Sequence, residues 1–222
     1  MILGVNDAAK RMGVRPERVL KLIHDGRLEA QKVGSRWVID ESALASKVWV
    51  KSPGRPMSAK SAMVLAQALE GKEPSDLSAV EKHRLQKHIR NLLAHSDPKS
   101  QLQSWFAARA PVLDFSVSDS DISELREDPR IKLSGISDPR SGLLPGNELE
   151  AYISKSELDR LRSEWFLVPA KNRQKANVIL HVLDKLPAEI PALFSAMDLA
   201  EHPGPREQSA ANSIIRSVLN GH

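Results

Sequence analysis

The chain has 222 residues, of which 41% are hydrophobic and 27% are charged. Its length and apolar content are sufficient for a sizeable core and for more than one domain. The sequence contains no cysteine, which excludes a disulfide framework and a thiolate metal site and is compatible with a reducing compartment. It has neither an apolar signal core at its N-terminus nor an apolar run of about 18 residues, so we expect no membrane segment.

The formal net charge of +4 is unevenly distributed. Residues 1–60 carry 12 Lys or Arg side chains against six acidic ones, and the remaining residues carry a small acidic excess. A basic segment on a mildly acidic body indicates that this segment binds a polyanion. A solvated basic surface is the plainer alternative.

Two short helices separated by a tight turn are predicted near the N-terminus. The first covers residues 7–12, where apolar residues recur at helical spacing, and Gly13 follows it. The second begins at Pro16, whose φ is already helical, and ends near Gly26, which can adopt the left-handed conformation. A helix, a turn and a helix at this spacing are typical of a helix-turn-helix unit.

The second of these helices has a basic outward face. Its predicted buried stripe consists of three apolar residues, Val19, Leu20 and Ile23. The residues expected to point outward are Glu17, Arg18, Lys21 and Leu22. A recognition helix needs a basic face because its first turns meet phosphates and base edges in the major groove.

A β-hairpin is predicted after the second helix. The runs LEAQKV (28–33) and RWVI (36–39) are separated by Gly34-Ser35, and a Gly at the first position of a two-residue loop favours a type II′ turn. Four apolar residues then share one face of the hairpin, namely Leu28, Ala30, Trp37 and Ile39. Arg36 lies on the other face at the tip, where a wing can place it against the DNA backbone. Asp40 is expected to cap a last short helix over 44–47.

The segment 2–48 resembles the helix-turn-helix domain shared by excisionases and MerR-like regulators. The stretches that carry the resemblance are Ala8-Ala9, Gly13-Val14, 19–23, Gly26-Arg27-Leu28 and 33–37. The resemblance implies a winged helix-turn-helix whose second helix reads the major groove of double-stranded DNA. Arg15 stands where the family usually has a Ser or Thr cap, so we expect Arg15 to contact a phosphate or a base.

A connector is predicted over 49–57, because Pro53 and Pro56 exclude a continuous helix. Its Gly54-Arg55-Pro56 core resembles an AT-hook, in which an extended arm lies in the minor groove of A·T-rich DNA. Pro56 favours an extended backbone at Arg55, and a narrow A·T-rich minor groove attracts an inserted Arg. A plain connector is the alternative. The full set of predicted DNA-binding residues is Arg15, Glu17, Arg18, Lys21, Arg27, Arg36, Lys51 and Arg55.

Residues 58–222 are predicted to form a second, mixed α/β domain with a helical lead-in and a small sheet. Together with the winged helix-turn-helix over 1–48, this domain puts the whole chain in the α+β class. The lead-in comprises helices from Ser58 to Leu69, from Ser75 or Asp76 to His95, and from Pro98 to Arg109. The predicted buried residues of the long helix are Leu77, Val80, Leu85, Ile89, Leu92 and Leu93. Short extended runs over 112–117, 130–136, 148–153, 165–169 and 177–183 then alternate with helices over 121–127, 156–164 and 206–219.

Residue patterns typical of catalysis are not found in the sequence. It contains no phosphate loop, no nucleophile elbow and no His-Glu-x-x-His motif. The Gly- and Pro-rich loop 134–148 is polar, but the strand that follows lacks the acid-x-Lys spacing of a two-carboxylate nuclease, and a polar turn is predicted there. The stretch 198–207 is predicted to be the turn before the last helix.

The histidines do not form a metal-binding pattern either. His83, His88 and His95 are not spaced as an i, i+4 pair, so they are predicted to be surface residues. His181 lies inside an apolar strand and is predicted to be a hydrogen-bonded core residue. We therefore expect no metal, no cofactor and no enzymatic activity.

The sequence predicts a sequence-specific DNA-binding transcriptional regulator, expected to be a repressor, in the cytoplasm of a bacterial cell. Its second domain is expected to bind further DNA or a protein partner. One alternative is an excisionase-like factor that bends DNA for a recombinase, although excisionases usually consist of little more than the first domain. The other is an antitoxin that represses its own operon, because a winged head on an α/β body resembles the layout of AbiEi-like antitoxins and of phage repressors.

Overall fold

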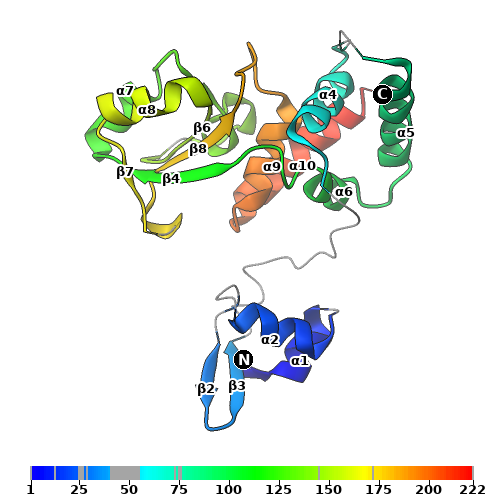
Figure 1. The fold of residues 1–222 in the computed structure, drawn as a ribbon, viewed down its shortest axis with the longest axis vertical. Helices are drawn as coiled ribbons and strands as arrows, with labels where there is room; N and C mark the ends of the chain where they lie inside the picture. The colour runs from blue at the N-terminus through cyan, green and yellow to red at the C-terminus, as the bar shows by residue number, and fades with distance from the viewer. Residues whose placement is uncertain are drawn as a thin grey trace. The chain divides into compact units, whose positions relative to one another are not determined.

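The computed structural model of the chain describes residues 2–12, 14–24, 28, 30–40, 56–72, 74, 77–144, 146–171 and 173–221. The chain divides into two compact units, residues 1–51 and 52–222, and each is considered by itself (Figure 1). The predicted helix over 44–47 and residues 49–55 of the predicted connector lie outside the described residues. No helix in the described ranges is long and apolar enough to cross a lipid bilayer.

The N-terminal unit combines two helices with a three-stranded antiparallel sheet. Its elements in chain order are β1 (Ile2–Gly4), α1 (Val5–Met12), α2 (Pro16–His24), β2 (Gln31–Val33) and β3 (Arg36–Asp40). The strand order is β1-β3-β2, so β3 pairs with both neighbours. β1 was not predicted because three residues are too few to show an alternating pattern.

The hairpin between β2 and β3 has the predicted register and turn. Val33 pairs with Arg36, which leaves Gly34 and Ser35 as the loop. Gly34 has a φ of +62° and Ser35 does not have a positive φ. A type I′ turn needs positive φ at both positions, so these angles fit the type II′ turn.

The buried stripe of α2 differs from the prediction at two positions. Leu22 is fully buried, whereas Leu20 is only half-buried. The prediction that Leu20 is buried and Leu22 points outward was therefore wrong. Val19, Leu22 and Ile23 stand at i, i+3 and i+4 and so share one narrow face, while Leu20 is rotated by about 100° from Val19.

The second unit begins with three helices that pack on one another. They are α4 (Ala59–Leu69), α5 (Ala79–Leu93) and α6 (Pro98–Trp105). Ser58 caps α4 as predicted. α5 begins later than predicted, because Ser78 and Glu81 form a capping box that fixes its first turn.

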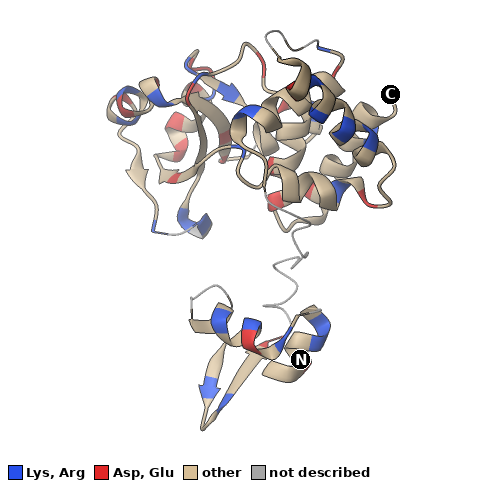
Figure 2. Ribbon diagram, turned by 45° about the vertical axis from the view of Figure 1, so that its right-hand side comes forward, with Lys and Arg blue, Asp and Glu red and all other residues tan. Residues whose placement is uncertain are grey.

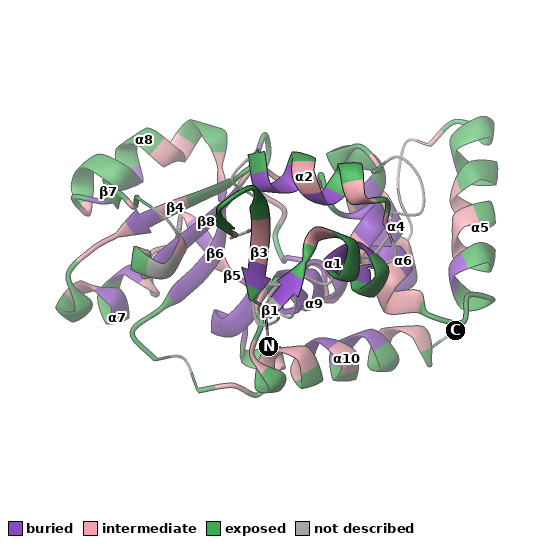
Figure 3. Cartoon of the chain, turned by 90° about the horizontal axis from the view of Figure 1, so that it is seen from below, coloured by how far each residue is buried: buried purple, intermediate pink, exposed green. Residues whose placement is uncertain are grey.

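The predicted buried face of α5 is too wide. Leu92 is buried and Leu85 and Ile89 are half-buried, but Val80 and Leu93 are 59% and 44% exposed. The reason is the position of the helix, because α5 contacts α4 and α6 along one stripe and is otherwise exposed (Figure 3).

A five-stranded sheet forms the other half of the second unit. Its strands are β4 (Val112–Ser116), β5 (Ile131–Leu133), β6 (Leu149–Ser154), β7 (Val168–Pro169) and β8 (Val178–Leu183), in the order β5-β6-β8-β4-β7. β6 and β8 are parallel and the other pairs are antiparallel. α8 (Lys155–Glu164) lies in the crossover between the two parallel strands, as such a connection requires. The mixed α/β architecture predicted for this part of the chain is confirmed.

The two parallel strands, β6 and β8, are buried on both faces of the sheet. Along β6, Leu149, Ala151 and Ile153 belong to a core with α7 (Ile122–Leu125) and α8. Tyr152, on the opposite face, belongs to a second core built from α4, α6, α9 (Ala192–Glu201) and α10 (Pro205–Leu219). Because side chains alternate along a strand, the polar residues Glu150 and Tyr152 both point toward α9.

Candidate nucleic-acid interface and a buried polar cluster

The turn between α1 and α2 fixes the position of Arg15. The Val14 N–H donates to the Ala9 carbonyl over 3.0 Å, and the Arg18 N–H donates to the Arg15 carbonyl over 3.0 Å. Arg15 therefore occupies the N-cap position of α2, and its exposed side chain makes no cap of the Ser or Thr kind.

The predicted contact residues on α2 share an exposed surface. Arg15, Arg18 and Lys21 are exposed, and none of them forms an ion pair with any residue that the structure describes. Arg18 and Lys21 are three residues apart, so they are neighbours on the helix surface. Glu17 is also exposed and stands one turn before Lys21. The structure thus places four of the predicted residues on the exposed surface of α2 and at its N-cap. Figure 2 shows the charged positions of this unit.

The hairpin supplies further cations. Arg36 is exposed at the start of β3, opposite Val33, which is 63% exposed. Lys32 on β2 was missed by the prediction although its pairing with Trp37 follows from the hairpin register. The Lys32 Nζ lies 5.9 Å from the centre of the Trp37 ring, a cation–π contact. His24 at the end of α2 contacts the same ring edge-on at 6.1 Å, so Trp37 connects the hairpin to α2.

Three predicted residues, Arg27, Lys51 and Arg55, lie outside the described residues.

The two units differ in net charge. Residues 1–51 carry ten Lys or Arg against six acidic residues, and residues 52–222 carry 22 of each. The net positive charge of the protein therefore resides in the N-terminal unit.

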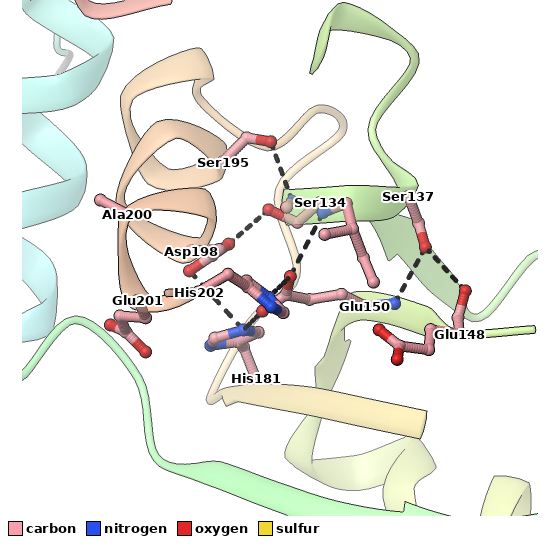
Figure 4. Close-up of polar contacts among 12 residues, drawn as sticks. Ser134, Ser137, Glu148, Glu150, His181, Ser195, Asp198, Ala200, Glu201 and His202 are labelled. Carbon is pink, nitrogen blue, oxygen red and sulfur yellow. Dashed lines mark hydrogen bonds and ion pairs between the residues drawn. The ribbon is translucent and has the colours of Figure 1, made fainter. Parts of the chain in front are cut away.

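A cluster of polar side chains lies buried in the second unit, between the sheet and α9 (Figure 4). β6 contributes Glu150 and Tyr152, β8 contributes His181, and α9 contributes Ser195 and Asp198. The sequence did not predict this cluster. Its members are far apart in the chain, and the available signal was a charged residue in the middle of a strand that is otherwise apolar.

Glu150 is held by two histidines. Its Oε1 lies 3.1 Å from Nε2 of His181, and its Oε2 lies 2.9 Å from Nε2 of His202, the residue that follows α9. Burial would raise the pKa of Glu150, but the hydrogen bonds and positive charge of these histidines hold it far below its usual range. Burial would lower the pKa of His202, but Glu150 raises it. Both shifts favour the charged pair, in which a carboxylate faces a protonated imidazole.

Glu150 also lies against the backbone of Gly135, which has a φ of +52°. A Cβ at this position would lie 1.8 Å from Oε2 of Glu150. The Gly135 N–H donates to Oγ of Ser195 over 2.9 Å, so the loop is fixed against α9. Glycine is required here both for the backbone conformation and for the close approach of the carboxylate.

Asp198 is paired with a buried arginine. Nε of Arg109 donates to Oδ1 of Asp198 over 3.0 Å and lies 3.1 Å from the Tyr152 hydroxyl. The Tyr152 hydroxyl donates to Oδ1 of Asp198 over 3.2 Å, and the Ser134 hydroxyl donates to Oδ2. Burial raises the pKa of Tyr152 well above its usual value, and Asp198 raises it further. Arg109 also pairs with the half-exposed Glu201 over 2.7 Å.

His181 is buried as predicted. Its ring stacks on Tyr152 at 4.7 Å. Its Nδ1, however, has no hydrogen-bond partner within the part of the chain that the structure describes, so its hydrogen bonding is incomplete.

The prediction that His88 is a surface residue was wrong. It is half-buried, and its ring centre lies 5.0 Å from that of Trp105. Burial lowers the pKa of His88, and Lys87 lowers it further.

Glu150, His181 and Asp198 each offer one possible metal-ligand atom, and these three atoms lie within 4.8 Å of one another. Such an arrangement could hold a divalent cation. The guanidinium of Arg109 opposes this, because it already neutralises Asp198 and would lie beside the added positive charge. The cluster is therefore charge-compensated by side chains of the protein itself.

His202 also lines a cavity of about 540 Å³ together with Glu148, Arg206 and Glu207. Two basic side chains and two carboxylates line this cavity, so it has no clear preference for a charged ligand.

Comparison with known proteins assigns the N-terminal unit. Residues 2–46, about a fifth of the chain, match a family described as a helix-turn-helix domain. The N-terminal unit is therefore a helix-turn-helix DNA-binding domain, and the predicted resemblance is confirmed. No curated protein and no solved structure matches the chain.

Proposed function

We propose that the protein is a sequence-specific transcriptional regulator that represses a promoter by occupying it through its helix-turn-helix domain. The observation that carries this proposal is the set of exposed cations Arg15, Arg18 and Lys21, at the N-cap and on the outward face of α2. They form no ion pair with a described residue, and their unit matches a helix-turn-helix family. α2 would lie in the major groove, with Arg36 of the hairpin acting as a wing against the phosphate backbone.

The contacts have separate roles in this proposal. Arg15, at the N-cap of α2, is suited to a phosphate, because the N-terminus of a recognition helix faces the DNA backbone and base edges. Arg18 and Lys21 on the outward face are suited to guanine, the commonest base contact of these side chains. Glu17 can accept a hydrogen bond from cytosine N4. Sequence preference then depends on Arg18, Lys21 and Glu17, and general affinity on Arg15 and Arg36.

Arg55 extends this interface in the proposal. Its Gly-Arg-Pro setting suits an arm in the minor groove of A·T-rich DNA beside the major-groove site. The test is Arg55→Ala on sites flanked by A·T or by G·C pairs. An arm predicts a loss of affinity confined to the A·T flank, and equal small effects on both flanks would leave a plain connector.

We further propose that the second unit acts by binding and not by catalysis, and that the protein works in the bacterial cytoplasm on chromosomal or phage DNA. What supports a binding role is the pairing of both buried carboxylates, Glu150 and Asp198, with basic side chains of the protein itself. Removing a partner would leave such a carboxylate buried and unpaired, which is strongly destabilising, and a carboxylate held in this way is a poor general base.

A footprint on the DNA upstream of the protein's own gene tests the proposal. We expect protection of a short site that includes major-groove contacts, abolished in the double variant Arg18→Ala, Lys21→Ala. Protection that is unchanged in this variant would contradict the assignment of α2. Protection at a recombination site and not at a promoter would favour the excisionase role, and derepression by a co-purifying toxin would favour the antitoxin role.

A further inference from the structure

We propose that the outward face of α5 is a second DNA-binding surface, which contacts the phosphate backbone beside the site held by the helix-turn-helix domain. This inference rests on the proposed function, because the flanking DNA becomes available only when the N-terminal unit is bound. It assigns to the second unit a DNA contact that the helix-turn-helix match does not cover.

The charged residues on the face of α5 that points away from the core are all basic. Its 15 residues extend over about 22 Å. At about 100° per residue, His83, Lys87 and Arg90 lie on the side opposite the buried Leu92. Lys82 and Arg84 border this group on either side, and all five side chains are exposed.

Among the described residues, no acidic side chain forms an ion pair with this face, although Glu81 interacts electrostatically with Arg84. Glu81 is the one acidic residue in the sequence of α5, and its Oε2 accepts hydrogen bonds from the Ser78 N–H over 2.9 Å and from the Ser78 hydroxyl over 2.7 Å. Its other oxygen lies 4.0 Å from Nζ of Lys60, whose exposed side chain belongs to α4. Lys82, Arg84, Lys87 and Arg90 form no ion pair with any residue placed by the structure.

The basic face is exceptional within its unit. Residues 52–222 carry equal numbers of basic and acidic side chains. Five arginines elsewhere in this unit are bound to carboxylates, namely Arg109, Arg130, Arg140, Arg160 and Arg173. The basic residues of α5 stand apart from these pairs at the edge of the domain (Figure 2).

Folding does not explain why these charges are concentrated there. Arg84, Lys87 and Arg90 are spaced three residues apart, and like charges at this spacing destabilise a helix. The helix packs through one stripe, and its remaining surface is exposed. A polyanion would relieve this repulsion and cover the surface.

DNA is the polyanion that fits best. The N-terminal unit holds DNA on the same chain, so binding by α5 is intramolecular and gains from a high effective concentration. A row of Lys and Arg side chains with Gln86 and Asn91 beside them is suited to phosphate oxygens, which accept hydrogen bonds from all four residue types. An acidic protein partner would offer no comparable advantage.

The test compares two variants with the same change in net charge. The α5 variant carries Lys82→Gln, Arg84→Gln, Lys87→Gln and Arg90→Gln. The control variant changes four exposed cations on other surfaces that form no ion pair with a described residue, namely Lys155→Gln, Arg162→Gln, Lys171→Gln and Lys185→Gln.

Full-length proteins are titrated by fluorescence anisotropy onto a mixed-sequence duplex of about 40 base pairs, roughly four helical turns. Salt is varied from about 50 to 200 mM, because nonspecific binding at low salt needs no known operator. In the α5 variant, the slope of log K against log salt should fall by about 0.9 for each phosphate that the protein no longer neutralises, and we expect about two to four such phosphates. The control variant should leave the slope close to that of the wild type.

Equal slopes for the α5 and control variants would overturn the inference. This is also the result expected if α5 binds a protein partner and not DNA. The variant Arg18→Ala, Lys21→Ala separates this failure from failure of the proposed function. If wild type binds and this double variant binds weakly, the helix-turn-helix assignment stands regardless of α5. If the wild-type protein does not bind the duplex at low salt, both proposals fall. Circular dichroism of each variant verifies that the fold is retained.

Discussion

Replacing Leu22 by Ala should unfold the N-terminal unit and leave the second unit intact. Leu22 is fully buried on α2, and a buried Leu→Ala change costs about 2–5 kcal/mol. Domains are stabilised by about 0.05–0.15 kcal/mol per residue, so a unit of this size has roughly 3–8 kcal/mol in total. The substitution therefore removes most of the stability of the unit, and DNA binding is abolished with it.

Leu20→Ala is the matched control, because it makes the same chemical change at a half-buried position on the same helix. It should cost about 1 kcal/mol, a typical value for a single substitution away from the core centre. Hydrogen exchange measured by mass spectrometry on the full-length protein reports both effects. Leu22→Ala should abolish protection of peptides within 5–24 and preserve it in α9. Equal protection in the two variants, or greater loss of protection in Leu20→Ala, would refute the assigned stripe.

Three further predictions concern the second unit. Gly135→Ala places a Cβ against Glu150 and puts a residue with a side chain at a positive φ. The melting temperature of the unit should therefore fall, because the backbone strain alone removes about 1–3 kcal/mol of stability. An unchanged melting temperature would show that the loop can move away. Because Glu150 raises the pKa of His202 and is itself held below its usual pKa, the stability that this pair contributes is complete between about pH 4.5 and pH 6.5, the usual values of the two groups. It is lost as pH rises through the folded-state pKa of His202. His202→Gln should remove this decline in denaturant titrations, and an identical pH profile would contradict the pairing. Residues 58–222 expressed alone should show a cooperative thermal transition, since both cores of the unit lie within this range, and a gradual transition would show that they depend on the N-terminal unit.

The helix-turn-helix domain could be predicted because its signals are local. Pro16 begins α2, and Gly34 fixes the hairpin turn; each acts within a few residues of its position in the sequence. The exchange of Leu20 and Leu22 in the predicted stripe arose because both fit an apolar stripe when only one helix is considered. Packing against α1 and Ile39 decides between them.

α9 and the polar cluster could not be predicted, for a different reason. Nearly all of α9 is buried, from Leu193 to Ala200, so its sequence lacks the apolar and polar alternation that identifies an amphipathic helix. Arg109, Glu150 and Asp198 come together only through the order of the sheet and the packing of α9 on it. In α5 the opposite error occurred, because its five large apolar residues suggested a broad buried face, whereas tertiary packing covers one stripe.

The salt dependence of DNA binding tests the central claim most directly. The full-length protein is compared with the quadruple variant Arg15→Ala, Arg18→Ala, Lys21→Ala, Arg36→Ala on the same duplex. Each phosphate that the variant no longer neutralises should lower the slope of log K against log salt by about 0.9, so we predict a slope reduced by up to roughly four and a large decrease in affinity at low salt. A folded quadruple variant that binds DNA with the slope of the wild type would contradict the claim that α2 and the hairpin form the DNA-binding surface.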